Sequence, residues 1–215
     1  MSKCLPANKY EMTSTENHTP DTDASLLEQY LDGEEDAFAR LVQRYEVPLY
    51  GFLSRYLGDE AAAEDTFQET FVQVHRSAGA FDTSRPFKPW LYTIALNKAR
   101  DALRRRGQPA VSLDASMGDD DENSFSGTIP TNISSPEEIS MNREAVSAVR
   151  NIVEDMPDKY RSVLVLCYFQ ELTNKEVSEI IGIPEGTVKS RLHAAVRDFS
   201  SRWEKWAGDE GSGNE

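Results

Sequence analysis

The sequence predicts an all-α protein: two small helical domains joined by a flexible acidic linker, the second containing a helix-turn-helix. Apolar residues recur at helical spacing, and no period-2 run typical of strands appears anywhere in the 215 residues. A stretch rich in Asp, Ser, Gly and Thr separates two groups of amphipathic segments. The expected division is a disordered tail 1–22, a first domain 23–107, a linker 108–135, a second domain 136–206 and a disordered tail 207–215.

Four helices are expected in the first domain. Asp23 is predicted to cap a short first helix. The apolar positions from Phe38 to Tyr56 then mark a long amphipathic stretch, kinked or broken near Pro48. Asp59 caps a third helix, and a fourth begins near Pro86 after a loop. About 85 residues are enough for a small core of this kind.

The second domain opens with Ser135-Pro136-Glu137-Glu138, a capping box with proline at the first helical position. This helix continues to Met156, and the next covers about 159–169. Cys167 lies in an apolar run and is interpreted as a core residue. The other cysteine, Cys4, lies in the tail, so neither a disulfide nor a metal site is expected, as suits a reducing cytoplasm.

Residues 173–203 predict a helix-turn-helix. Thr173 caps its first helix, Glu176 completes a capping box, Gly182 supplies a positive φ, and the second helix starts at Glu185. The second helix of such a motif enters the major groove of DNA. The alternative is an ordinary helical hairpin with a solvated polar face. Lying off its apolar face are Lys189, Ser190, Arg191, His193, Ala194 and Arg197.

Charge is unevenly distributed along the chain, whose net charge is −14. Segment 108–140 holds seven acidic residues and no basic one, whereas segment 85–106 holds seven basic residues against Asp101 alone. Basic side chains beside aromatic ones suit single-stranded nucleic acid. We expect Trp90 to be buried and Asn97, Lys98 and Arg100 to contact DNA. The acidic side of the third helix is either a solvated face or a docking face for a basic partner.

Several classes of protein are excluded. No paired Cys, His or Asp arrangement suits nucleophilic catalysis, and no glycine-rich loop follows a strand, so we expect neither an enzyme nor a cofactor. The acidic run 119–122 lacks the spacing of a calcium loop and is interpreted as linker. There is no signal peptide and no apolar run long enough to cross a membrane, so a cytoplasmic binding protein is expected.

These segments resemble the extracytoplasmic-function group of bacterial RNA polymerase sigma factors over roughly residues 24–107 and 137–206. The segment 63–71 looks like the polymerase-docking helix of that family, and 87–106 like its promoter-melting helix. Segments 156–161 and 186–192 are similar to its terminal domain. Ala194 stands where a long side chain often reaches DNA, which leaves the −35 sequence preference open.

The resemblance implies binding to core RNA polymerase, through the β′ clamp and the β flap, and to promoter DNA. It also implies an anti-sigma factor as a partner. The resemblance assigns contact with polymerase to Asp65, Gln68 and Glu69. It assigns contact with the −10 element to Phe81, Arg85, Lys88, Asn97, Lys98, Arg100 and Arg104. It assigns contact with the −35 element to Lys189, Ser190, Arg191, His193, Ala194 and Arg197.

Two other functions remain open from the residues alone. A stand-alone helix-turn-helix regulator would bind duplex DNA tightly without polymerase. An adaptor that binds only proteins would use the acidic third helix and would leave the Arg104-Arg105-Arg106 cluster without a role.

Overall fold

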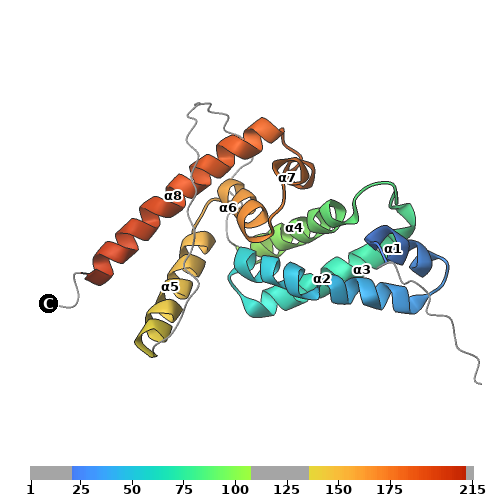
Figure 1. Cartoon of the computed structure of the whole chain (residues 1–215), viewed down its shortest axis with the longest axis horizontal. Helices are drawn as coiled ribbons and strands as arrows, with labels where there is room; N and C mark the ends of the chain where they lie inside the picture. Colours follow the sequence, from blue (N-terminus) through green and yellow to red (C-terminus); the bar gives the residue numbers. More distant parts are fainter. Residues whose placement is uncertain (1–20, 108–135, 212–215) are drawn as a thin grey trace, which may run out of the picture.

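The computed structural model describes residues 21–107 and 136–211, and every regular element in these two ranges is helical (Figure 1). The expected linker and most of the two tails lie outside them. Domain 1 comprises α1 (Asp23–Leu31), α2 (Glu35–Leu57), α3 (Glu60–Ser77), the 3-10 helix η1 (Ala78–Ala80) and α4 (Phe87–Arg105). Domain 2 comprises α5 (Pro136–Glu154), α6 (Asp158–Leu164), the π-helix η2 (Val165–Phe169), α7 (Asn174–Ile181) and α8 (Glu185–Gly211).

Domain 1 is organised around α2, which packs against α1, α3 and α4. The apolar residues of α2 recur every three or four positions and therefore share one face. Complete burial of a Leu or Phe side chain contributes about 2 kcal/mol to stability, and several helices supply such side chains here. Fully buried members of this core include Leu27, Leu41, Leu49, Phe52, Leu53, Tyr56, Leu91, Tyr92 and Leu96.

One prediction about the start of domain 1 was wrong. The N-cap of α1 is Thr22, whose hydroxyl accepts a hydrogen bond from the Ser25 amide at 3.1 Å. The Asp23 carboxylate instead accepts from the hydroxyl of Tyr45 at 2.5 Å. Helix α2 runs through Pro48 without a break, which excludes the broken helix of the two predicted alternatives. A proline removes one backbone hydrogen bond, but apolar residues on both sides of it pack into one core, which holds the two halves together.

The caps predicted for α3 and α7 are confirmed, whereas Ser135, predicted to cap α5, lies outside the described residues. Asp59 accepts from the Ala62 amide at 2.7 Å at the start of α3. Thr173 and Glu176 form the predicted capping box, and Gly182 ends α7 at φ +77°. Helix α8 begins at Glu185 as predicted. It continues to Gly211, beyond the predicted boundary at 206, so the expected tail is partly helical.

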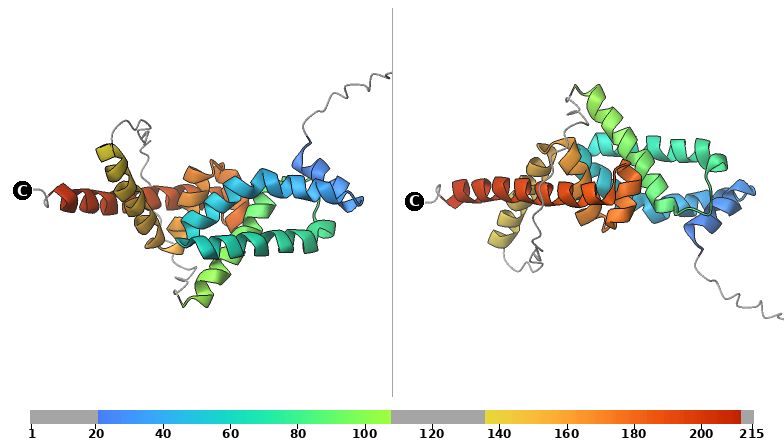
Figure 2. Two further views of the ribbon diagram at one scale, coloured as in Figure 1. Left: turned by 90° about the horizontal axis from the view of Figure 1, so that it is seen from below. Right: turned by 90° about the horizontal axis from the view of Figure 1, so that it is seen from above.

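The two domains pack against each other, which the sequence did not predict. Helix α4 contacts α7, and α2 contacts both α5 and the π-helix. Met156 is 1% exposed and belongs to an apolar cluster that continues from one domain into the other. Helix α5 and the C-terminal half of α8 project away from domain 1 (Figures 1 and 2).

Candidate polymerase and nucleic-acid interfaces

The three residues predicted to bind polymerase lie together on α3. Asp65, Gln68 and Glu69 are spaced so that they share one face, and they line a single groove with Lys98 of α4. Asp65 and Gln68 are exposed. Glu69 is half-buried and accepts hydrogen bonds from Arg105 at 3.3 and 3.4 Å. The groove lining carries two carboxylates, Asp65 and Glu69, and two cations, Arg76 and Lys98, so its charges balance.

Phe81 belongs to an aromatic cluster at the start of α4. Its ring centroid lies 4.4 Å from that of Trp90 and 6.0 Å from that of Phe87. Phe87 is buried, whereas Phe81 and Trp90 are half-buried and leave part of the cluster accessible. The adjoining loop turns at Asp82, which accepts from the amide and hydroxyl of Ser84. These hydrogen bonds hold the pKa of the Asp82 carboxyl below its usual value.

The residues predicted for the −10 element do not form one surface. Successive helical residues rotate by about 100°, so the polar positions of α4 point in three directions. Lys98 faces the groove on α3, within 4.0 Å of Glu69. Asn97 and Arg104 are exposed to solvent, and Arg104 pairs with Asp101 at 2.9 Å. Arg85 is exposed in the preceding loop, whereas Lys88 and Arg100 face domain 2.

Domain 2 holds Lys88 and Arg100 through specific contacts. The Lys88 ammonium lies 3.5 Å from the carbonyl oxygen of Gln170. The Arg100 guanidinium donates to one carboxylate oxygen of Asp158 from Nε at 3.2 Å and pairs with it through Nη2 at 3.1 Å. The hydroxyl of Tyr92, which is completely buried, donates to the side-chain oxygen of Gln170 at 2.7 Å.

Two further residues complete this interdomain network, Tyr56 and Arg161. The Tyr56 hydroxyl donates to Asp158, and burial and the Asp158 charge raise the pKa of that hydroxyl. Arg161 is 7% exposed and donates to the carbonyl oxygens of Tyr56 at 3.1 Å, Met156 at 2.9 Å and Glu154. It therefore caps the C-terminal ends of α2 and α5 together.

The sequence did not predict the interdomain contacts of Tyr56, Tyr92, Asp158, Arg161 and Gln170. One signal was available: a tyrosine on an apolar helix face needs a partner for its hydroxyl. Tyr56 and Tyr92 both stand on such faces, but the sequence does not say where their partners lie.

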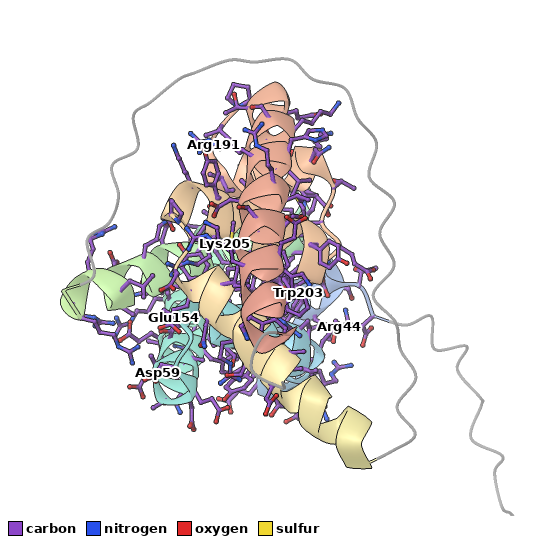
Figure 3. All side chains as sticks on the ribbon, turned by 90° about the vertical axis from the view of Figure 1, so that its left-hand side faces the viewer. Arg44, Asp59, Glu154, Arg191, Trp203 and Lys205 are labelled. Carbon is purple, nitrogen blue, oxygen red and sulfur yellow. The ribbon has the colours of Figure 1, made fainter. Side chains whose placement is uncertain are left out.

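The exposed face of α8 brings together most of the residues predicted for the −35 element. Lys189, His193 and Arg197 recur every four residues, and all three are exposed, as is Ser190. The opposite face is buried. Arg191 and Ala194 are half-buried at the edges of this exposed face. Figure 3 shows Arg191 near the start of α8, with Lys205 much further along the helix.

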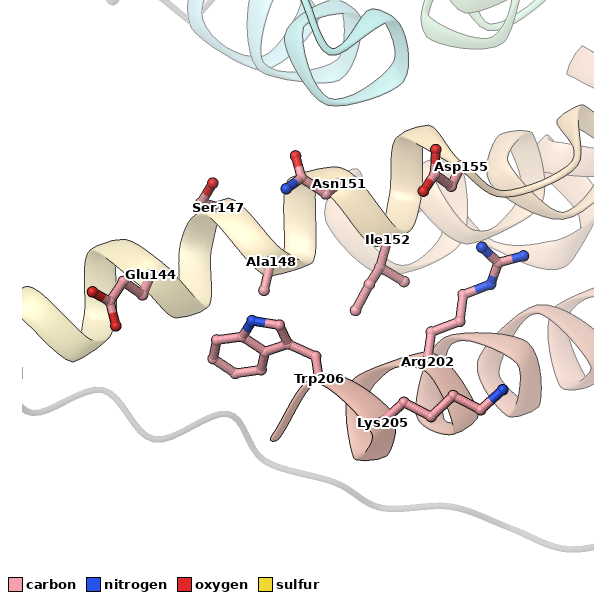
Figure 4. Close-up of a pocket in the computed structure, with 9 residues that line it drawn as sticks. All are labelled: Glu144, Ser147, Ala148, Asn151, Ile152, Asp155, Arg202, Lys205 and Trp206. Carbon is pink, nitrogen blue, oxygen red and sulfur yellow. The ribbon is translucent and has the colours of Figure 1, made fainter. Parts of the chain in front are cut away.

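A second groove lies between α5 and the C-terminal half of α8 (Figure 4). Ala148, Ile152 and Trp206 supply apolar surface, while Asp155, directly after α5, and Lys205 on α8 contribute opposite charges. Elsewhere in domain 2, burial raises the pKa of the Cys167 thiol to about 11. Within the two described ranges there is no cluster of His, Cys, Asp and Glu suited to a metal. Nor is any helix there long and apolar enough to cross a membrane.

Comparison with known proteins identifies the family. The Sigma-70 region 2 model matches residues 41–108, and the Sigma-70 region 4 model matches residues 147–199. The chain is 36% identical over 167 residues to the ECF RNA polymerase sigma factor SigW of Bacillus subtilis, covering 78% of this chain and 89% of that protein. It is 33% identical over 178 residues to the ECF RNA polymerase sigma-E factor of Escherichia coli, covering 81% and 90%.

Two solved structures share the fold. CnrH in complex with the cytosolic domain of CnrY matches with a TM-score of 0.64 at 23% identity, over 85% of this chain and 97% of that one. RpoE of Bartonella quintana in complex with the anti-sigma factor NepR matches with a TM-score of 0.53 at 19% identity, over 75% and 95%. The chain therefore belongs to the extracytoplasmic-function group of RNA polymerase sigma factors, which bind core polymerase and direct promoter-specific initiation of transcription.

Proposed function

We propose that domain 1 docks on core polymerase through the α3 groove and opens the −10 element, while the exposed face of α8 holds the −35 element as duplex. The assignment rests on one observation: each domain carries a separate surface whose chemistry suits the partner proposed for it. The groove on α3 exposes the Asp65 carboxylate and the Gln68 amide, which can pair with cations and hydrogen-bonding groups of a protein partner. A helix face with Lys189 and Arg197 suits the major groove and its phosphates.

In this proposal the −10 contacts divide between base capture and backbone contact. Extrusion of a base from the duplex costs a few kcal/mol, which stacking and phosphate contacts must offset. The accessible part of the Phe81 cluster, with Arg85 and Asn97, would receive the flipped base. The remaining cations, Lys88, Lys98, Arg100 and Arg104, would contact the backbone of the non-template strand.

The protein acts as a binding factor in the cytoplasm, where core polymerase works, and carries out no catalysis of its own. Its partners are the β′ clamp, the β flap, promoter DNA and an anti-sigma factor. The last is supported by the complex of RpoE with the anti-sigma factor NepR, because this chain shares the fold of RpoE.

Run-off transcription with purified core polymerase on fragmented genomic DNA tests the assignment. We expect Gln68→Ala to weaken binding to core polymerase by roughly tenfold, in the range of a contact residue near the centre of an interface. The matched control is Gln43→Ala, which removes an exposed glutamine from α2 outside the groove. Absence of any promoter-dependent transcript when this protein is added to core polymerase would contradict the proposal.

A second pair of variants tests the α8 face. Lys189→Ala should weaken promoter binding by the holoenzyme and reduce its salt slope by about 1, as loss of a single phosphate contact does. Lys205→Ala removes an exposed lysine further along the same helix and should leave both quantities unchanged. Tight duplex binding by the free protein would instead favour a stand-alone regulator.

A further inference from the structure

The exposed face of α8 carries three basic side chains in one row. Lys189, His193 and Arg197 stand one helical turn apart, and all three are exposed. With a rise of about 1.5 Å per residue, the row is about 12 Å long. Lysine and arginine stay charged at neutral pH, whereas histidine is the side chain whose charge ordinarily changes between about pH 5 and 8. The middle position of the row is therefore the one whose charge depends on pH.

Both ring nitrogens of His193 can meet a ligand. Within the two described ranges its ring makes no hydrogen bond, ion pair or ring contact. His75, the other histidine in those ranges, differs because its Nδ1 is paired with the hydroxyl of Tyr30. The His75 ring also packs against that of Phe38, with the centroids 6.1 Å apart. A protonated His193 thus has two N–H donors that no described residue uses.

The charged groups next to His193 come from α8 itself. Lys189 and Arg197 lie one turn away on either side. Helices α5, α6 and α7 pack against the opposite side of α8, where Val188 and Ala195 are fully buried. In the part of the chain that the structure describes, no charged residue of those helices forms an ion pair or hydrogen bond with His193: not Glu144, Arg150 or Glu154 of α5, Asp158, Lys159 or Arg161 of α6, or Lys175, Glu176 or Glu179 of α7.

Phosphate oxygens are the ligands that suit this row. An imidazolium forms charge-assisted hydrogen bonds with phosphate, which are roughly twice as strong as bonds between neutral groups. Phosphates that approach Lys189 and Arg197 also bring negative charge close to His193, and a nearby opposite charge favours the protonated form. DNA should therefore bind the protein with a protonated His193 more tightly than the protein with a neutral one.

We propose that His193 contacts a phosphate of the −35 duplex as the imidazolium, so that promoter binding takes up one proton. The inference rests on the proposed contact of the α8 face with the −35 element. Because the bound state holds more protons than the free state, promoter affinity increases as the pH falls and decreases as the pH rises. Lys189 and Arg197 supply an attraction that is constant near neutral pH, and His193 supplies one that depends on pH.

Fluorescence anisotropy of a labelled promoter fragment tests this between about pH 6 and pH 8. The fragment is one recovered by the run-off transcription described above, and it is titrated with holoenzyme assembled from core polymerase and the full-length protein. His193→Gln is neutral throughout this range, and His193→Lys is charged throughout it. The affinity of the wild type relative to His193→Gln should rise roughly three- to tenfold from pH 8 to pH 6. His193→Lys should keep its high affinity at pH 8.

The salt dependence of binding gives a second measurement, because each neutralised phosphate adds about 0.9 to the slope. The wild-type slope should be steeper by about 1 at pH 6 than at pH 8, and the His193→Gln slope should be equal at both. The matched control is His75→Gln, which makes the same substitution at an exposed histidine of α3 and should follow the wild type. Titration of core polymerase cancels, since all the holoenzymes share it. Circular dichroism shows that each variant is folded.

The outcomes distinguish this inference from the proposed function. Parallel pH profiles and equal salt slopes in the wild type and His193→Gln would refute proton uptake by His193. A His193→Lys variant with the wild-type pH dependence would refute it too, because the titrating group would then lie elsewhere. The proposed function fails in a different way: Lys189→Ala would leave promoter affinity and its salt slope unchanged, which would show that the α8 face does not contact the −35 element.

Discussion

Replacing Arg161 by methionine removes every donor of the side chain but keeps an unbranched apolar stem of similar length. The guanidinium donates to the carbonyl oxygens of Tyr56, Met156 and Glu154, and the residue is 7% exposed. Each buried carbonyl that loses its donor costs about 1–3 kcal/mol. Relief of the buried charge offsets part of this cost, so we expect a net loss of about 3–5 kcal/mol in the free energy of unfolding.

Urea unfolding followed by circular dichroism measures this loss, and a thermal scan should show a midpoint about 10 °C lower for a chain of this size. The control is Arg202→Met, because the ion pair of Arg202 in the described part of the chain is with Asp198, one turn earlier on α8, at 3.0 Å. Such a pair contributes less than about 0.5 kcal/mol. A loss below about 1 kcal/mol for Arg161→Met would refute the view that Arg161 caps two helices.

Two further predictions concern the domain interface and the buried thiol. Gly58→Ala should destabilise the protein by about 1–2 kcal/mol, as measured by urea unfolding, because Gly58 ends α2 at φ +68°. The added Cβ would also meet the Glu154 carboxylate, but that group is the end of a flexible side chain and can move aside. An unchanged free energy of unfolding would contradict this. With Cys4 replaced by serine, Cys167 should react with iodoacetamide slowly at pH 8 and faster toward pH 11. The reason is that burial raises the pKa of the Cys167 thiol to about 11. A reaction rate at pH 8 equal to that of the urea-unfolded protein would contradict this prediction.

The helix-turn-helix was predictable in detail because its signals are local. The Thr173 capping box and the positive φ of Gly182 depend on residues within one turn of each other, and both were confirmed. The start of α8 at Glu185 follows from the same signals. The groove residues Asp65, Gln68 and Glu69 could be placed on one face because helical spacing alone sets that relation. Their contact with polymerase stays a prediction.

The failures have physical causes too. The sequence did not show that Asp23 would serve a tertiary contact with Tyr45, which left the N-cap of α1 to Thr22. Nor did it show that packing would keep α2 continuous through Pro48. In each case a local preference was overridden by a contact between residues distant in sequence.

By itself the sequence determined the helical class, the caps of α3 and α7, and the family. The tertiary structure decided which polar side chains of α4 are exposed to solvent and which contact domain 2. Asp158 is 102 residues from Tyr56 and 58 from Arg100, and no periodicity or cap relates such positions. These residues come into contact because the apolar surfaces of the two domains pack together. That packing depends on the shapes of the two surfaces and not on the local sequence pattern. Arg100, which the sequence assigned to DNA, therefore lies against a carboxylate of its own chain.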